Sequence, residues 1–246
     1  FAEAVGSLKA CTGKPEDMGG IPHELGSTGF GVAHAAALSI ERSGLDINQV
    51  KVAIEGFGNV ARFTFKYLSQ FGAKIVAVSD SKGYIHDPGG LNFEELSRVK
   101  RETKSVINYK PGKALRNQDL FGLDVDVLIP AALSDSITME NVARVKAKVV
   151  VEGANIPITS EAEEFLYRKG VLVIPDFVAN AGGVISSYAE YKGYKAEEIF
   201  ELIEEKIKKT AGIVLDRARE KGTTAREAAN EIAKEKVKKA MKKREM

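Results

Sequence analysis

Five short apolar segments recur along the chain, and each predicts a buried β-strand. They cover residues 50–54, 74–79, 125–129, 148–152 and 171–174. Each is a nearly continuous run of small and branched apolar residues, which is typical of parallel strands covered by helices on both faces. Between them, apolar residues recur at helical spacing. Strands alternating with helices predict an α/β fold with a doubly wound, mostly parallel, Rossmann-like sheet.

The same pattern divides the chain into three parts. Residues 1–27 carry little periodicity and many turn formers, so we expect a linker there. Residues 28–190 form the predicted sheet domain, and residues 191–246 are C-terminal helices expected to pack on it. In that last part, Thr224-Ala225-Arg226-Glu227 has the form of a capping box. Because the chain opens on Phe1 rather than Met, we interpret it as a piece of a longer protein.

The first predicted strand runs directly into Gly56-Phe57-Gly58 and then into a helix. This arrangement aims the helix's first N–H groups and its dipole at one spot, which suits a pyrophosphate. Gly56 permits the turn, and Gly58 lets the backbone approach the phosphates closely. Ala61 stands at the third position of the fingerprint, where a small residue allows close helix packing.

Asp80 ends the second predicted strand, where a dinucleotide site places a carboxylate for the adenosine ribose hydroxyls. The alternative is an ordinary glycine turn with a solvated aspartate at a strand end. The order of strand, glycines, helix, strand and acid favours the dinucleotide interpretation. Ser81 and Lys82 follow at once and offer donors to a 2′-phosphate, so the choice between NAD and NADP stays open.

Composition excludes several other classes. The 246 residues include 36 basic and 34 acidic side chains, a net charge of +2 that gives no electrostatic footprint for nucleic acid. No apolar run reaches the roughly 18 residues of a membrane span. The single cysteine, Cys11, excludes an internal disulfide framework and predicts a reducing compartment. We therefore expect a cytoplasmic protein without nucleic-acid or membrane partners, and an inert thiol.

The residues that usually carry acid–base or metal chemistry form no site of their own. His23, His34 and His86 show neither triad nor metal-ligand spacing, and no pair of carboxylates stands out as acid and base. We expect His34 to pack on its helix. The sequence thus predicts no catalytic residue and no metal site in this chain.

Several stretches together resemble the C-terminal, cofactor-binding part of the glutamate dehydrogenases. They span nearly the whole chain in the family's order. These stretches are Thr12-Gly13-Lys14-Pro15, Ser27-Thr28-Gly29-Phe30-Gly31-Val32, Gly56-Phe57-Gly58-Asn59-Val60, Val78-Ser79-Asp80-Ser81-Lys82-Gly83, Ile129-Pro130-Ala131-Ala132, Val151-Glu152-Gly153-Ala154-Asn155, Pro175-Asp176-Phe177, Asn180-Ala181-Gly182-Gly183-Val184 and Ser187-Tyr188-x-Glu190.

The resemblance implies roles for individual residues. Thr28 is expected to reach the nicotinamide end of the coenzyme, and Asn59 to lie beside the phosphates. Asn155 and Asn180 are expected near the nicotinamide and the substrate α-carbon, and Ser187 on the distal carboxylate of the substrate. The alternative is that Thr28, Asn59 and Asn180 cap helices and Asn155 closes a turn. The whole predicted coenzyme site is Thr28, Gly56, Phe57, Gly58, Asn59, Val60, Asp80, Ser81, Ala131, Ala132, Asn155 and Asn180.

The resemblance also implies a reaction for the parent protein: reversible oxidative deamination of L-glutamate to 2-oxoglutarate and ammonia, with NAD or NADP. The family's N-terminal domain supplies the substrate lysines and the catalytic aspartate. We therefore expect this piece to bind coenzyme without turnover. The parent is expected to be a homo-oligomer, and the isolated piece is expected to be a monomer.

Some residues depart from the family pattern. Phe30 stands where an arginine is common, and Ala189 and Tyr191 replace the usual Phe and Trp. In having an aromatic residue at position 30, the sequence is similar to those of the branched-chain and aromatic amino-acid dehydrogenases. Two alternatives therefore stay open: the cofactor domain of such an enzyme, and a stand-alone NAD(P)-binding module without activity.

Overall fold

The structure, a computed structural model, describes residues 1–22 and 25–244, so the prediction made for His23 lies outside it. Within the described residues, seven strands form one sheet in the order β4-β3-β2-β1-β5-β6-β7. The five predicted strands are its parallel part. They are β1 (Lys51–Glu55), β2 (Lys74–Asp80), β5 (Val127–Pro130), β6 (Val149–Val151) and β7 (Leu172–Ile174). The predicted Rossmann-like α/β fold is confirmed.

Two strands were not predicted. β3 (Gly83–His86) pairs antiparallel with β2, and β4 (Lys113–Leu115) pairs antiparallel with β3 at the sheet edge. Neither strand contains a continuous apolar run, because Gly83 and His86 flank two apolar residues in β3 and β4 has only Ala114 and Leu115 after Lys113. A Cβ on Gly83 would lie 2.6 Å from the Leu115 carbonyl oxygen, so glycine allows the two edge strands to approach.

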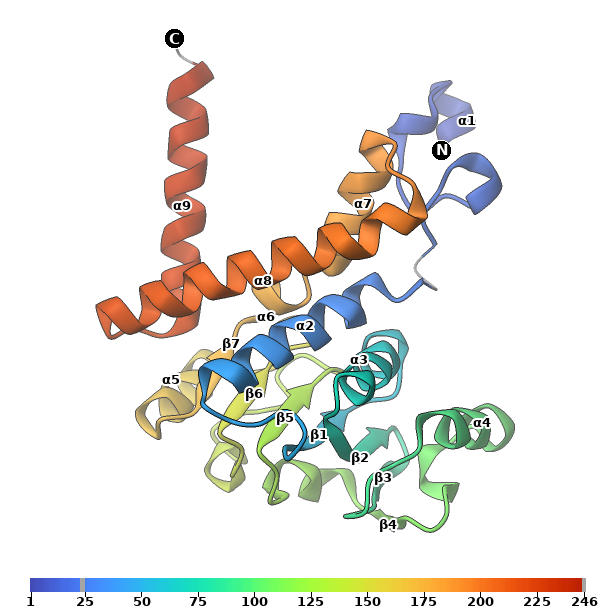
Figure 1. Cartoon of the computed structure of the whole chain (residues 1–246), viewed down its shortest axis with the longest axis vertical. Helices are drawn as coiled ribbons and strands as arrows, with labels where there is room; N and C mark the ends of the chain where they lie inside the picture. Colours follow the sequence, from blue (N-terminus) through green and yellow to red (C-terminus); the bar gives the residue numbers. More distant parts are fainter. Residues whose placement is uncertain (23–24, 245–246) are drawn as a thin grey trace.

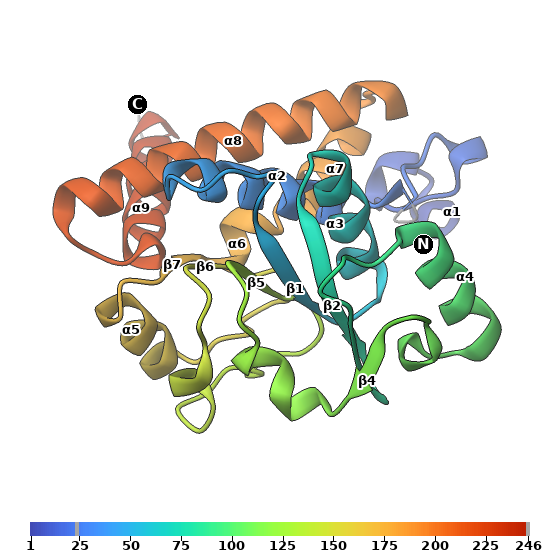
Figure 2. The same ribbon diagram turned by 60° about the horizontal axis from the view of Figure 1, so that its bottom comes forward.

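Helices cover both faces of the sheet (Figure 2). Along β1, Val52 and Ile54 join the larger apolar cluster on one face, and Ala53 joins the smaller cluster on the other. The first face is covered by α2 (Ser27–Arg42), α3 (Asn59–Gln70), α4 (Phe93–Thr103) and α8 (Ala196–Lys221). The second is covered by α5 (Ser160–Arg168) and the 3₁₀ helices η5 (Asn117–Gly122) and η6 (Val142–Arg144). Burial of the strands from both sides explains their continuous apolar sequence.

The short helices complete the chain. α1 (Ala2–Val5), η1 (Leu8–Ala10) and η2 (Glu16–Met18) precede the sheet domain, η4 (Val106–Asn108) follows α4, and α6 (Asp176–Ala179) and α7 (Gly182–Lys192) follow β7. The segment of residues 1–22 lies beside α7 and away from the sheet (Figure 1). No helix in residues 1–22 or 25–244 is long and apolar enough to cross a membrane.

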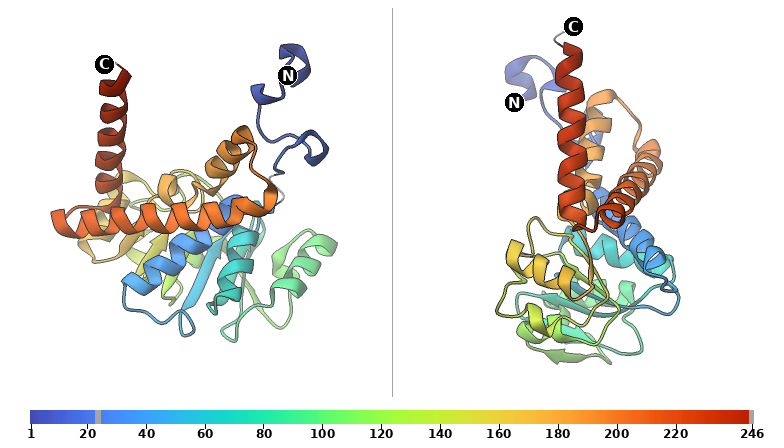
Figure 3. Two further views of the ribbon diagram at one scale, coloured as in Figure 1. Left: turned by 45° about the horizontal axis from the view of Figure 1, so that its top comes forward. Right: turned by 90° about the vertical axis from the view of Figure 1, so that its left-hand side faces the viewer.

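The two C-terminal helices behave differently. α8 lies along α2 in both Figure 1 and Figure 2. After a turn at Gly222, α9 (Ala225–Arg244) leaves the body of the molecule at a steep angle (Figure 3). Ile232 is buried, whereas residues 233–242 are all exposed. The predicted capping box is confirmed, because the Glu227 N–H donates to Thr224 Oγ1 at 3.1 Å and the Thr224 N–H to Glu227 Oε2 at 3.0 Å.

Candidate functional site

The strand order reverses at β1, which has β2 on one side and β5 on the other. In such sheets a crevice opens at this point, beyond the carboxyl ends of the strands. Gly56 follows β1 and Ala131 follows β5, so both residues lie at the mouth of this crevice. The Gly56 N–H donates to Ser79 Oγ at 2.8 Å, which ties the turn to the end of β2.

The two glycines of the turn are there for different reasons. Gly56 has φ +95°, and an added Cβ would lie 3.1 Å from the Ala131 carbonyl oxygen. At Gly58 the backbone φ is −80° and an added Cβ would meet no atom within 4 Å. The fold therefore does not require glycine at 58, and the space in front of it is open. Gly58 also precedes α3 without a side-chain cap, so the helix's first N–H groups point toward that space.

The alternative that three of these residues cap helices is wrong for Thr28 and Asn59 but not for Asn180. α3 has Gly58 as its N-cap and contains Asn59 as its first residue. α2 likewise has Gly26 as its N-cap, and Thr28 lies within its first turn. Asn180 follows α6 and precedes the N-cap of α7, which is Ala181. Thr28 and Asn59 are therefore not helix N-caps. Asn180 is the C-cap residue of α6, so it does stand at a helix end.

Two hollows adjoin the turn, and together they contain every predicted site residue except Asn59, which opens α3 beside them. The β2-side hollow, of about 800 Å³, includes Gly56, Phe57, Gly58, Asp80 and Ser81 in its lining. The β6-side hollow, of about 610 Å³, includes Thr28, Val60, Asn155, Asn180 and Ser187. Ala131 and Ala132 line both. The two hollows therefore meet in front of the glycine turn.

Asp80 lies at the β2-side hollow with its carboxylate already bonded within the protein. Its Oδ1 accepts from the Lys82 N–H at 2.9 Å and from Ser105 Oγ at 3.2 Å. Its Oδ2 accepts from Lys100 Nζ at 2.7 Å and from the Val106 N–H at 2.8 Å. Burial acts to raise the pKa of Asp80, but these hydrogen bonds outweigh it and hold the pKa below its ordinary value. A ribose hydroxyl would have to share or replace one of these donors.

Several residues of the β2-side hollow were missed by the sequence analysis. Lys100 comes from α4, Asn117 from η5, and Glu140 and Arg144 from the segment around η6. Asn117 Nδ2 also donates to the Asp80 carbonyl oxygen at 2.7 Å. Lys100 and Asn117 reach the hollow because the β3–β4 edge folds residues 93–124 back over it, whereas Glu140 and Arg144 reach it from the connection between β5 and β6. No motif or period in the sequence gives that path.

The β6-side hollow is lined by apolar and neutral polar residues; none of its lining side chains is ionisable. Asn180 Nδ2 donates to Asn155 Oδ1 at 2.7 Å, so the two predicted asparagines are joined. α2 and α7 approach closely at its rim, because a Cβ on Gly183 would lie 2.6 Å from Thr28 Oγ1. Thr28 and Ser187 thus face the same space from adjacent helices.

Ionisable groups lie behind this neutral wall. Glu152, at the end of β6, is fully buried and binds Arg226 Nη2 through Oε2 at 2.6 Å. Burial raises the pKa of Glu152 to about 7 even though Arg226 opposes the shift. On α7, Glu190 accepts from the Gly13 N–H at 2.8 Å and forms an ion pair with Lys14. This pair ties the segment before α2 to the helix that carries Ser187.

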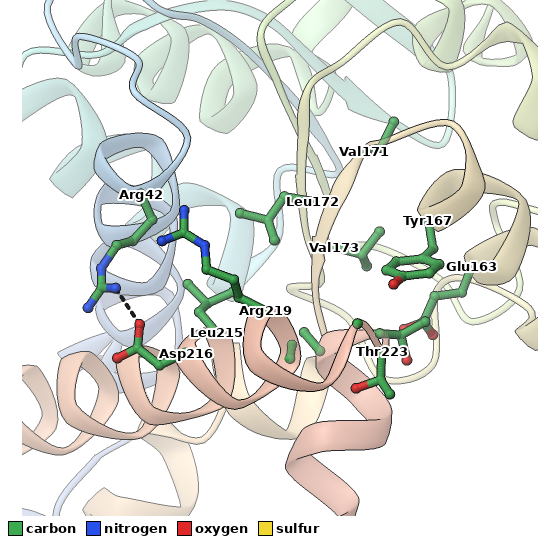
Figure 4. A pocket seen from close by; sticks show the side chains of 14 residues that line it. Arg42, Glu163, Tyr167, Val171, Leu172, Val173, Leu215, Asp216, Arg219 and Thr223 are labelled. Atoms are coloured by element: carbon green, nitrogen blue, oxygen red, sulfur yellow. Dashed lines mark hydrogen bonds and ion pairs between the residues drawn. The ribbon is translucent and has the colours of Figure 1, made fainter.

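A separate cavity of about 300 Å³ contains none of the predicted residues (Figure 4). It lies against the edge strand β7, between α5 and the corner that joins α8 to α9. Leu172 and Leu215 line its centre, with the Arg42–Asp216 ion pair at one side and Glu163 at the other (Figure 4). No residue of the glycine turn lines it.

Two further residues are placed in the core. His34 is 4% exposed and packs edge-on against Phe30, with ring centroids 4.4 Å apart. Burial lowers its pKa to about 4, so the prediction of a packed histidine is confirmed. Phe30 also contacts Tyr67 and Phe200 edge-on, and it lines neither hollow. Its departure from the family pattern is therefore a matter of helix packing.

Among the described residues, no group of His, Cys, Asp and Glu is arranged to hold a metal.

The fold and the glycine turn at its switch point define a Rossmann-like α/β domain. Comparison with protein families identifies it further. The chain belongs to the Glutamate/Leucine/Phenylalanine/Valine dehydrogenase family, whose model matches residues 19–245. The resemblance drawn from the sequence motifs is confirmed.

Individual relatives of the chain are consistent with this family. The chain is 42% identical over 241 residues to the glutamate dehydrogenase of Aeropyrum pernix, covering 94% of this chain and 58% of that protein. It is 43% identical over 206 residues to the NADP-specific glutamate dehydrogenase of Saccharolobus shibatae, covering 84% and 48%. The hetero-hexameric glutamate dehydrogenase of Thermus thermophilus, in its leucine-bound form, has a similar structure. That similarity has a TM-score of 0.89 at 30% identity and covers 99% of this chain and 60% of that one. The chain thus spans about half the length of the curated relatives.

Proposed function

We propose that this chain is the coenzyme-binding part of an NAD(P)-dependent glutamate dehydrogenase. The parent reaction is the reversible oxidative deamination of L-glutamate to 2-oxoglutarate and ammonia. The observation that carries the proposal is the meeting of two hollows at Ala131 and Ala132, in front of an open glycine turn and an uncapped helix. A dinucleotide has two halves joined by a pyrophosphate, and this arrangement suits that shape.

The β2-side hollow would take the adenosine half. The N–H groups at the start of α3 would hold the pyrophosphate, with Gly58 leaving room for it and Asn59 and Val60 beside it. Asp80 and Ser81 would lie at the ribose. The fold does not require glycine at position 58, because an added Cβ would meet no atom within 4 Å. The open space in front of Gly58 therefore supports this assignment.

The β6-side hollow would take the nicotinamide half. When bound, the coenzyme supplies hydride chemistry at the substrate α-carbon. Thr28, Asn155 and Asn180 would orient the ring by neutral hydrogen bonds, and Ser187 would donate to the distal carboxylate of glutamate. Glutamate carries two carboxylates and an ammonium group, yet the lining of this hollow holds no charge to pair with them. The chain by itself should therefore bind coenzyme without turnover.

Both coenzymes are candidates. Asp80 is expected to repel a 2′-phosphate less than a free carboxylate would, because Lys100 binds it at 2.7 Å. The relatives include both an NADP-specific and an NAD-specific glutamate dehydrogenase, so they favour neither coenzyme. We assign residues 28–190 to the coenzyme domain, residues 191–246 to C-terminal helices on it, and residues 1–27 to a linker. We further propose a cytoplasmic, homo-oligomeric parent.

Titration calorimetry of the chain with NADH and NADPH tests the proposal, and binding of at least one is expected. A spectrophotometric assay with excess glutamate and either oxidised coenzyme should give no NAD(P)H above background. Absence of coenzyme binding would overturn the assignment. A rate that scales with protein concentration would show that the chain carries its own acid and base. Activity of the full-length protein across amino acids separates glutamate from branched-chain and aromatic substrates.

A further inference from the structure

Arg226 is the second residue of α9, and its position is fixed by the corner that precedes it. Gly222 turns the chain with φ +62°, and the Thr224–Glu227 capping box sets the first turn of α9. The side chain of Arg226 then points back toward the sheet, and only 24% of it is exposed. The part of α9 nearest the sheet is therefore held in one orientation.

Three carboxylates converge on this one guanidinium. Its Nη2 lies 2.6 Å from Glu152, its Nε 2.5 Å from Glu163, and its Nη1 3.1 Å from Asp176. These acids come from the end of β6, from α5 and from the first residue of α6. Glu163 borders the cavity of Figure 4 beside the α8–α9 corner. The planar fork of an arginine holds its donors in fixed, widely spaced directions, whereas a lysine ammonium is a compact point charge and cannot reproduce this geometry.

Two of these acids continue into the loops of the β6-side hollow. Asp176 accepts from the Ile156 N–H through Oδ2 at 2.9 Å, and Glu152 accepts from the Asp176 N–H at 2.8 Å. Ile156 has φ +48°, a conformation that a branched residue keeps only when its surroundings impose it. These two hydrogen bonds thus hold the loop after β6, at Ile156, and the start of α6, at Asp176. The two segments lie on opposite sides of the hollow.

The asparagines lie one step further on. Asn155 precedes Ile156, Asn180 ends the segment that Asp176 begins, and the two side chains bond at 2.7 Å. The neutral lining of the hollow therefore depends on an ionic support behind it. Removal of the central cation leaves three neighbouring carboxylates without their shared partner, and they would repel one another.

We propose that Arg226 is a positioning residue for the nicotinamide end of the coenzyme site. It holds Asn155 and Asn180 in place through Glu152 and Asp176, so the seating of α9 on the sheet sets the geometry of the β6-side hollow. This inference rests on the proposed function. The β2-side hollow contains none of these residues, so we expect Arg226 to have little effect on it.

The test compares Arg226→Gln and Arg226→Lys with Arg217→Gln in the 246-residue chain. Arg217 is a matched control, because it also joins α8 to α9 by ion pairs, with Glu231 and Glu235, but away from both hollows. Two probes are titrated: NADH, followed by calorimetry and by the emission of its nicotinamide, and ADP-ribose, which lacks the nicotinamide. The second probe reports the β2-side hollow and the fold.

In both Arg226 variants we expect NADH affinity to fall about tenfold and the change in nicotinamide emission to disappear, while ADP-ribose affinity stays within about twofold. Arg217→Gln should match the wild type. Unchanged NADH binding and emission would overturn the inference, as would a parallel loss of ADP-ribose affinity, which marks a merely structural role. Where Arg226→Gln does not fold, Arg226→Lys decides by the same readings. A wild-type chain that binds neither probe would overturn the proposed function itself.

Discussion

The two hollows in front of the glycine turn differ in where their charges lie. The β2-side hollow has ionised side chains in its lining, among them Asp80, Lys100 and Arg144. The β6-side hollow has a neutral lining, and the ionisable groups near it, Glu152 and Arg226 among them, lie behind the wall. The first can pair directly with a charged ligand. The second can orient a neutral ring, but it has no charge of its own to offer a charged substrate.

This difference indicates a division of labour. A dinucleotide brings its negative charge at the pyrophosphate, where the turn and the start of α3 can meet it. An amino acid at the β6-side hollow would need cations from outside this lining, because exposed neutral donors cannot balance two carboxylates. The four predictions below test this comparison.

The largest effect is expected where the two hollows meet. Gly58→Val places a branched side chain in the open space before α3, so affinity for NADH, NADPH and ADP-ribose should fall at least ~100-fold, or about 2.7 kcal/mol. The fold should be kept, because an added Cβ meets no atom within 4 Å. Calorimetry measures the affinity. Gln70→Val, at the other end of α3, is the control and should bind normally. Undiminished binding by Gly58→Val would mean that no ligand crosses the turn.

The second prediction concerns the charge behind the β6-side wall. The folded pKa of Glu152 is raised from 4.5 to about 7, so the folded state binds this proton more tightly than the unfolded state does. Its contribution to stability is fully present below pH 4.5 and is lost as pH rises through 7. Discounting for the coupling to Arg226, we expect a loss of about 2 kcal/mol across this range.

Urea denaturation at pH 5 and pH 8 measures this loss, and Glu152→Gln should remove it. Glu163 and Arg226 remain in both proteins, so the difference between wild type and variant isolates Glu152. The same pH dependence in both proteins would show that Glu152 keeps an ordinary pKa, with Arg226 fully offsetting the effect of its burial.

The third prediction concerns the charge within the β2-side lining. Asp80→Asn removes a negative charge and leaves Lys100 without its carboxylate partner beside the hollow. We expect the affinity for NADPH relative to NADH to rise about tenfold, or about 1.4 kcal/mol. Lys100→Met should move the ratio the other way. A ratio that stays constant in both variants would restrict Asp80 to holding the end of β2 against η4.

The parallel sheet and the glycine turn could be predicted from the sequence because both depend on local patterns. Continuous apolar runs are specific to buried parallel strands, and Gly56-Phe57-Gly58 lies between such a strand and a helix. The lining from Lys100, Asn117 and Arg144 could not be predicted. Lys100 and Asn117 depend on short edge strands whose pairing is set by tertiary contacts, and Arg144 comes from the irregular connection between β5 and β6, so no period in the sequence indicates them.

The cluster of three carboxylates around Arg226 could not be predicted from the sequence for a related reason. Glu152, Glu163, Asp176 and Arg226 are up to 74 residues apart, and each alone looks like an ordinary charged residue. Thr224-Ala225-Arg226-Glu227 predicted the start of α9 correctly, yet nothing in it tells where Arg226 points. The stretch Val151-Glu152-Gly153-Ala154-Asn155 led us to predict Asn155 as a site residue. It does not show which residues hold the Asn155 side chain in place.

The smallest effect is expected at Ser187, on the substrate side of the β6-side hollow. Ser187→Ala removes a hydroxyl that we assign to the distal carboxylate of glutamate, so NADH affinity of the chain should change less than about twofold, or about 0.4 kcal/mol. Thr28→Ala, on the adjacent helix α2, is the matched comparison and should weaken NADH more, because Thr28 is assigned to the ring. Both are measured by calorimetry under identical conditions. A tenfold loss in Ser187→Ala would make Ser187 a coenzyme ligand. The substrate carboxylate would then have to bind elsewhere, and the neutral lining would belong to the coenzyme alone.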